Sequence, residues 1–242
     1  MSQTSLPNRK ELIYGILNNQ QFQATTSVNS DDVSVEHFAM LIDNQNNAHF
    51  FWHGIFHSGP SWHYITQYRK KDSSGNWREI ETLNLYEQVA ETPCLISDGN
   101  NNIHLVWHSL YKLKKTNVSK INYLAKNGDF TIASSTINSK SPYSLIVVSP
   151  SISLDSQNKI YLVWKRYDEK YISLKEYSDN EWQEAKNLFL VNKGDVSYLN
   201  LLWSNYPLIN NKKTSQPKTG FAFIFYQDNE LKFYASEDLE WD

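Results

Sequence analysis

Three stretches of the chain place apolar and polar residues in nearly the same order. They are Ala48–Gly54 (AHFFWHG), Ile103–Ser109 (IHLVWHS) and Ile160–Arg166 (IYLVWKR). Each is short and rich in aliphatic and aromatic residues, and each carries a tryptophan at its fifth position, which is typical of a buried β-strand. The recurrence of one strand pattern indicates an internal repeat.

An aspartate stands nine residues before each of these tryptophans and closes an earlier apolar run; the three are Asp43, Asp98 and Asp155. The residues between are mostly Asn, Gly, Ser, Gln and Lys, and the first three of these favour tight turns. Each repeat is therefore predicted to contain a hairpin. In two repeats a proline, Pro93 or Pro150, stands five residues before the aspartate, where a strand that starts there loses no ladder hydrogen bond.

A second hairpin pattern follows each first one, with an apolar strand, a polar turn and an aromatic residue where the chain restarts. The same phrase also occurs near both ends of the chain, and the aromatic residues are Phe22, Trp77, Phe130, Trp182 and Trp241. Trp52 and Trp107 are 55 residues apart, and Trp107 and Trp164 are 57 apart. The repeating unit is thus four strands long.

A four-stranded antiparallel unit at this period is typical of a β-propeller blade, whose two apolar faces are covered by neighbouring blades. We expect an all-β chain with no helix, forming a single β-propeller domain over residues 1–242 with about five blades when partial ones are counted. The predicted ranges are a partial blade at 10–30, blades at about 31–83, 84–140 and 141–193, and an incomplete final blade at 194–242. Three arrangements remain open: residues 20–28 complete the final blade, the chain forms part of a larger ring, or a five-blade or open arrangement lies between these two.

The turn segments Lys71–Trp77 (KDSSGNW) and Tyr177–Trp182 (YSDNEW) resemble the Asp-box of sialidase-type (BNR) propellers. Residues 148–166 (VSPSISLDSQNKIYLVWKR) resemble the inner-strand hairpin of the same family. The resemblance extends over roughly residues 12–241, although the boxes KNGDF and SEDLEW keep only the turn and the aromatic residue. In that family the boxes lie away from the active face, so the resemblance implies a structural role for them here.

The resemblance also raises the question of sialidase activity, which in that family uses three arginines, a Tyr–Glu pair and an aspartic acid. This chain has four arginines, of which only Arg9 and Arg166 stand where they would face a ring centre; the other two are Arg69 and Arg78. General glycoside hydrolysis needs two facing carboxylates, and the candidates Glu91, Asp168, Glu169 and Asp195 show no spacing signature. We therefore predict no catalytic residue, with a diverged glycoside hydrolase as the alternative.

Histidine supplies the remaining candidate chemistry. His49, His53, His57 and His63 are too interrupted by Gly and Pro for the helix on which their spacing would suit a metal, so no metal and no cofactor is predicted. His53 and His108 directly follow repeated tryptophans, where Lys165 and Tyr226 also stand. The candidates for a rim that binds a sugar by stacking and hydrogen bonds are Trp52, His53, Trp107, His108, Trp164, Lys165, Arg166 and Tyr226. We expect the polar residues after the tryptophans to be exposed at this rim. For the tryptophans themselves, the favoured interpretation is that each fills space between blades.

The net charge limits the kinds of binding partner to expect, and the cysteine content limits the disulfides that the chain can form. The net charge is −3, which gives no electrostatic reason to expect a nucleic acid or an anionic membrane. The single cysteine, Cys94, excludes an intrachain disulfide. The N-terminus lacks the apolar segment of a signal peptide, so a cytoplasmic protein is expected. The sequence thus predicts a non-catalytic, sialidase-like propeller that serves as a glycan- or protein-binding or scaffold module, with a homo-oligomer formed through an unpaired blade edge.

Overall fold

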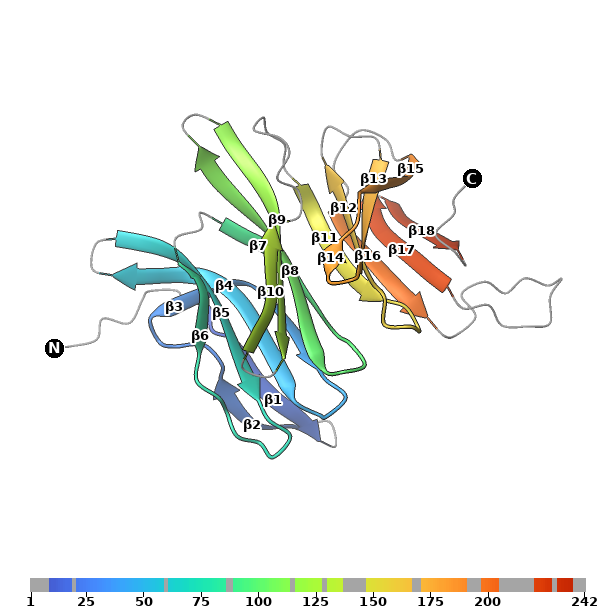
Figure 1. Cartoon of the computed structure of the whole chain (residues 1–242). Helices are drawn as coiled ribbons and strands as arrows, with labels where there is room; N and C mark the ends of the chain where they lie inside the picture. Colours follow the sequence, from blue (N-terminus) through green and yellow to red (C-terminus); the bar gives the residue numbers. More distant parts are fainter. Residues whose placement is uncertain are drawn as a thin grey trace. The chain divides into compact units, whose positions relative to one another are not determined.

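The chain folds into antiparallel β-sheets, as the hairpin patterns predict. A computed structural model describes residues 9–18, 21–58, 61–85, 89–113, 116–127, 130–136, 147–166, 171–190, 197–204, 220–227 and 230–236. Over these ranges the structure is all β, and no helix occurs (Figure 1). The chain divides into two compact units, Met1–Pro93 and Cys94–Asp242, and the boundary falls within strand β7 (Val89–Ser97).

The first unit contains a hairpin and a four-stranded sheet. The hairpin is formed by β1 (Ile13–Asn18) and β2 (Gln21–Ser27). The sheet has its strands in sequence order: β3 (Val33–Ile42), β4 (Ala48–Ser58), β5 (Ser61–Lys71) and β6 (Glu81–Leu85). Tyr14 of the hairpin lies edge-on to Phe50 and Trp77, with ring centroids 5.5 and 5.7 Å apart. The hairpin therefore supplies part of the core of this unit.

The second unit contains three sheets. The first comprises β7, β8 (Asn102–Leu113), β9 (Thr116–Asn127) and β10 (Phe130–Thr136). The next comprises β11 (Val147–Leu154), β12 (Ile160–Arg166), β13 (Tyr171–Ser178), β14 (Glu181–Trp182) and β15 (Lys186–Leu190). The last comprises β16 (Ser197–Ser204), β17 (Gly220–Gln227) and β18 (Glu230–Ser236). The repeated tryptophan strands are β4, β8 and β12, and each is an inner strand of its sheet.

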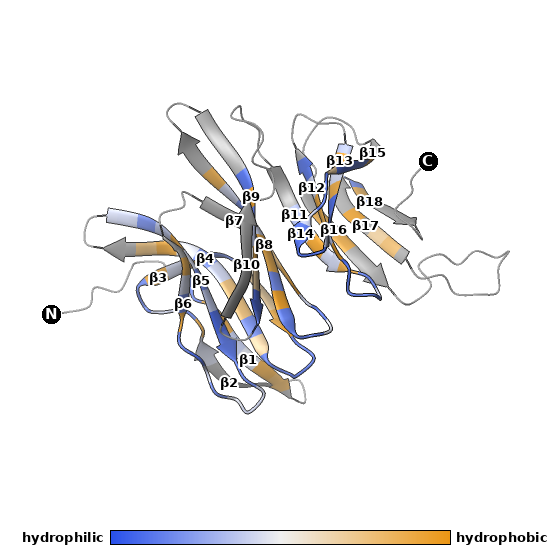
Figure 2. Ribbon diagram, in the orientation of Figure 1, coloured by the Kyte–Doolittle hydropathy of each residue, from blue (hydrophilic) through white to orange (hydrophobic). Residues whose placement is uncertain are grey.

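The middle sheet of this unit buries both of its faces. On one face Ile160, Leu162 and Trp164 of β12 join a cluster with Val106 and Tyr123 of the preceding sheet. On the other face the alternate residues Tyr161 and Val163 join a cluster with residues of the following sheet, namely Leu199, Leu201 and Phe221. Apolar side chains therefore occupy consecutive positions of β12, as expected for a strand covered on both sides. Figure 2 shows the hydrophobic residues concentrated in the strands and the hydrophilic residues in the turns.

One five-residue turn, Asp-x-x-Asn/Gly-Asn/Lys, joins strands at four places. It begins at Asp43, Asp72, Asp98 and Asp155, and in each copy the first residue donates its N–H to the carbonyl of the fifth. One carboxylate oxygen of the aspartate accepts the N–H of the fifth residue, at distances of 2.8 to 3.0 Å. The fourth residue has positive φ in every copy: Asn46, Gly75, Asn101 and Asn158. Asn and Gly tolerate this conformation, which explains the composition of the predicted turns.

The turn geometry predicts the tolerance of position 75. We expect Gly75→Asn to unfold at nearly the wild-type temperature, because asparagine adopts the same conformation in the other three copies. Gly75→Val should lower the free energy of unfolding by about 1–2 kcal/mol or more, since a β-branched residue is strained at positive φ. Thermal unfolding followed by circular dichroism measures both. Equal losses for the two variants would contradict this account of the turn.

Candidate functional site

The predicted rim residues lie on the inner strands, but their side chains are buried. Trp52 and His53 lie on β4, Trp107 and His108 on β8, and Trp164 and Lys165 on β12, and none of the six is more than 5% exposed. The expected exposure of His53, His108 and Lys165 at a rim is therefore wrong. Successive residues of a strand point to opposite faces, so a residue after a buried tryptophan reaches solvent only where the second face is open.

Two further rim candidates are placed only by their backbones. Arg166 ends β12 and pairs with Val147, and Tyr226 lies in β17, where it pairs with Leu231. Their side chains lie outside the described set, as does that of Phe225, which takes the tryptophan position in the fourth copy.

The tryptophans serve the core, which was the favoured interpretation of their recurrence. Trp52 and Trp164 belong to two hydrophobic clusters, and Trp107 is buried as well. Trp52 donates its indole N–H to Oε1 of Gln67, its cross-strand neighbour, at 3.1 Å. The corresponding neighbour of Trp164 is Ser173, and the buried indole nitrogen of Trp164 has no hydrogen-bond acceptor among the described residues.

A buried Asp–His–Tyr chain occurs on β4 and its neighbours. Nε2 of His49 lies 3.0 Å from Oδ2 of Asp43, and Nδ1 lies 2.7 Å from the hydroxyl of Tyr68. Burial lowers the pKa of His49, although the bond to Asp43 opposes that effect. A neutral imidazole that donates from Nε2 and accepts from the tyrosine at Nδ1 satisfies both contacts.

The second repeat forms the same chain. His104 lies 3.2 Å from Oδ2 of Asp98 and 2.8 Å from the hydroxyl of Tyr123. In the third repeat the place of the histidine is taken by Tyr161, whose hydroxyl donates to Oδ2 of Asp155 at 3.1 Å. One aspartate oxygen therefore closes the turn, while the other anchors a buried side chain of the following strand.

The Asp–His–Tyr order of these chains is similar to that of a catalytic proton relay, but the pKa values of their members favour a structural role. Burial raises the pKa of Tyr123, with Tyr177 and Asp98 adding to the effect, so this hydroxyl is a poor nucleophile. Burial alone would raise the pKa of Asp43, yet hydrogen bonds from Asn47, His49 and Gln45 lower it to about 2. The carboxylate is thus ionised, and its bonds hold the turn. The pattern in the sequence that marks these Asp–His–Tyr chains is a histidine three residues before the tryptophan in two repeats. Its pairing with the turn aspartate was not predicted.

His53 and His108 are held in their neutral forms. Burial lowers the pKa of each to about 4, with His37 contributing for His53. Nδ1 of His53 lies 3.2 Å from the hydroxyl oxygen of Thr66, and its ring stacks on Tyr64 with centroids 5.5 Å apart. Both pKa values lie well below 7, which makes these histidines weak general bases at neutral pH.

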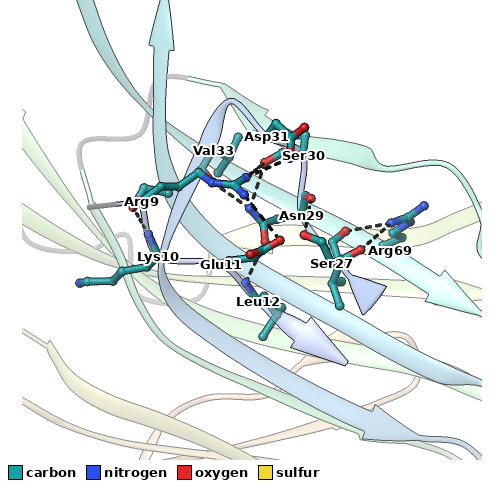
Figure 3. Close-up of polar contacts among 12 residues, drawn as sticks. Arg9, Lys10, Glu11, Leu12, Ser27, Asn29, Ser30, Asp31, Val33 and Arg69 are labelled. Carbon is teal, nitrogen blue, oxygen red and sulfur yellow. Dashed lines mark hydrogen bonds and ion pairs between the residues drawn. The ribbon is translucent and has the colours of Figure 1, made fainter. Parts of the chain in front are cut away.

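Two of the four arginines donate hydrogen bonds to the segment that follows the β1–β2 hairpin in the first unit (Figure 3). Arg9 donates from Nη1 to the carbonyl of Ser30 at 3.1 Å and also pairs with Asp31 at 3.3 Å. Arg69 donates to the carbonyl of Val28 at 3.0 Å and to the carbonyl of Arg78 at 2.9 Å. Both guanidinium groups bind backbone carbonyls, so Arg9, a candidate for the sialidase-type site, has a structural role here.

Asn29 lies between these arginines and organises the link from β2 to β3 (Figure 3). Its Oδ1 accepts the N–H of Leu12 at 2.8 Å, and its Nδ2 donates to the carbonyls of Ser30 and Val33 at 3.0 and 2.8 Å. The side chain is buried. The polar cluster around it therefore satisfies backbone groups that the link leaves without ladder partners.

The remaining candidates give no reactive cluster among the described side chains. Asp168, Glu169 and Asp195 lie outside the described residues, and the side chains of Glu91 and His57 lie outside them as well. Within the described part, no group of three or more His, Cys, Asp or Glu side chains could hold a metal ion. Burial raises the pKa of Cys94, so its thiol is mostly protonated at neutral pH.

Comparison with known proteins finds no match to any protein family and none to a curated protein. One solved structure that matches is the crystal structure of a protein of unknown function from Dyadobacter fermentans DSM 18053. The match has a TM-score of 0.38 and 8% sequence identity, and it covers 87% of this chain and 82% of that chain. In the described ranges, no helix has the length and apolarity needed to cross a membrane.

The buried histidines predict a loss of stability in mild acid. The unfolded chain binds protons at its histidines near pH 6.5, whereas native His53 and His108 resist protonation until about pH 4. Stability should therefore fall as the pH drops below about 6.5, by about 2 kcal/mol for each of these two residues at pH 5. Urea unfolding at pH 7, 6 and 5 measures the slope, and His108→Gln should make it shallower. A slope unchanged by this substitution would contradict the prediction.

The two indole environments predict different costs for removing the N–H group. Trp52→Phe removes a hydrogen bond and leaves Oε1 of buried Gln67 without its donor, whereas Trp164→Phe removes a donor that has no described acceptor. The volume change is the same, so Trp52→Phe should cost about 1–2 kcal/mol more. Chemical denaturation of the two variants tests this. A larger loss for Trp164→Phe would show that its nitrogen is bonded.

Proposed function

We propose that this chain is a sialidase-like β-propeller that acts as a non-catalytic binding module, with a glycan as its ligand. The observation that carries the proposal is that the polar side chains beside the repeated tryptophans are buried within the sheets. His49, His53 and His104 bond to other protein groups, so they hold the fold rather than act on a substrate.

The sheet arrangement supports the propeller within the second unit. Its three sheets follow one another along the chain, and each packs an apolar face on the next. The turns at Asp43, Asp98 and Asp155 stand at the same place in successive sheets. A ring of about five blades, counting partial ones, remains part of the proposal.

Exposed aromatic residues at one end of the strands favour a glycan. Trp62 is 67% exposed near the start of β5, and Tyr171 is 39% exposed at the start of β13. Both follow the connection between the second and third strands of a sheet, at the opposite end from the aspartate turns. Flat rings with an apolar body and a polar edge suit sugar stacking. Each of these positions, taken separately within its own unit, is a candidate contact in place of the buried rim.

A glycan array combined with a fluorogenic glycoside assay tests the proposal. We expect binding to at least one glycan class without turnover, and we expect Trp62→Ala or Tyr171→Ala to weaken it at least about tenfold through loss of stacking. Ser74→Ala, on the exposed turn at the other strand end, is the matched control and should bind normally.

Two outcomes would contradict the proposal. Glycoside turnover abolished by Arg166→Ala would favour the diverged hydrolase. A complete absence of glycan binding would leave a protein scaffold as the function of the fold.

A further inference from the structure

Strand β3 carries a row of exposed apolar side chains. Phe38, Met40 and Ile42 are 58%, 50% and 47% exposed, and they alternate along the strand, so they share one face. Their cross-strand partners are Trp52, Phe50 and Ala48, respectively, all of which are buried. Directly paired residues lie on the same face of a sheet. The row therefore continues the apolar face on which the β1–β2 hairpin packs, but the hairpin leaves the row uncovered.

The same part of β3 has an open edge. β3 is an outer strand of its sheet, and the beginning of its outer edge is engaged by the N-terminal segment. There Val35 donates its N–H to the carbonyl of Lys10 at 2.9 Å, and Lys10 donates its own N–H to Oγ of Ser34 at 3.1 Å. Beyond this point, none of the described residues pairs with positions 38–42 on the side away from β4. The open edge thus coincides with the apolar row.

The equivalent outer strand β11 is protected in two ways. Pro150 stands where β3 has Phe38, and the pairing of β11 with β12 shifts register between Val148 and Ser151, whereas β3 pairs without interruption from His37 to Ile42. Prolines and bulges keep strand edges from pairing with other chains. The residue of β11 that corresponds to Met40 is Ile152. It is only 2% exposed, because it packs on the preceding sheet. β3 has no proline, and its own register shift, between Val35 and His37, lies before the apolar row.

We propose that this edge pairs with β3 of a second copy of the chain. The strands would run antiparallel about a two-fold axis at Met40, so that Phe38 faces the partner's Ile42. In an isologous contact the residue at the axis meets its own copy and the other residues face each other in exchanged pairs, and like charges directly opposite one another would be destabilising. Positions 38–42 read Phe-Ala-Met-Leu-Ile and carry no charge, so the segment complements itself. The pairing brings the two apolar rows into lateral contact, so that each covers part of the other, and it completes the hydrogen bonds of both edges along positions 38–42.

The oligomeric state of the full chain tests the proposal. Light scattering after size-exclusion chromatography should show a dimer for the wild type. Met40→Lys places two ammonium groups at the axis and should raise the dimer dissociation constant at least about a hundredfold. Ile13→Lys, an equally exposed apolar position of the same unit, is the matched control and should remain a dimer. Circular dichroism confirms that both variants fold. A monomeric wild type, or dissociation by Ile13→Lys alone, overturns the proposal.

Cysteine cross-linking in a Cys94→Ala background tests the register. Met40→Cys should form a disulfide-linked dimer on mild oxidation, because its Cα lies opposite its own copy at a distance that suits a disulfide. Phe38→Cys and Ile42→Cys should cross-link poorly alone but efficiently when mixed. Equal cross-linking of all three alone would indicate unspecific association and overturn the pairing.

Discussion

The structure depends on covering both faces of its sheets. In the second unit, β12 places Ile160 and Leu162 in one hydrophobic cluster and Tyr161 and Val163 in another. Such a strand cannot lie at a solvent-exposed surface, since each face would expose several apolar side chains. A sheet that contains such a strand therefore needs a neighbouring sheet on both sides. A chain that repeats the sheet supplies those neighbours, and each repeat then needs a similar apolar strand. The recurrence of the tryptophan phrase is thus a packing requirement.

The buried strands limit where polar groups can go, and several of the buried polar side chains belong to the aspartate turns or bond to them. A turn carboxylate such as that of Asp98 accepts backbone N–H groups with one oxygen and bonds His104 with the other. Burying an ionised carboxylate is costly unless it is hydrogen-bonded, and each of these is bonded several times. His49, His104 and Tyr161 each bond to a turn carboxylate in this way. These titratable side chains therefore have structural partners within the described part of the chain.

The sequence predicted the strands and turns better than it predicted which side chains are buried. The hairpins, the aspartate turns and the core role of the tryptophans follow from local patterns, because alternation and turn chemistry act within a few residues. The exposure of His53, His108 and Lys165 depended on whether the second face of each strand is covered, which no local pattern reveals. The partner of His49 is likewise distant, since Tyr68 stands on the next strand. Pairwise contacts of this kind require the register, which the sequence leaves open.

The same constraint gives the β3 row its meaning. A sheet face that no other element covers normally carries polar side chains. Phe38, Met40 and Ile42 do the opposite, and they do so on a face that is already apolar beneath the neighbouring hairpin. A strand edge left to solvent would have polar side chains there, or a proline to blunt it as in β11. Since β3 has neither, its exposed half is better explained as an interface than as a free edge, and the strand that fits it must itself be apolar and uncharged.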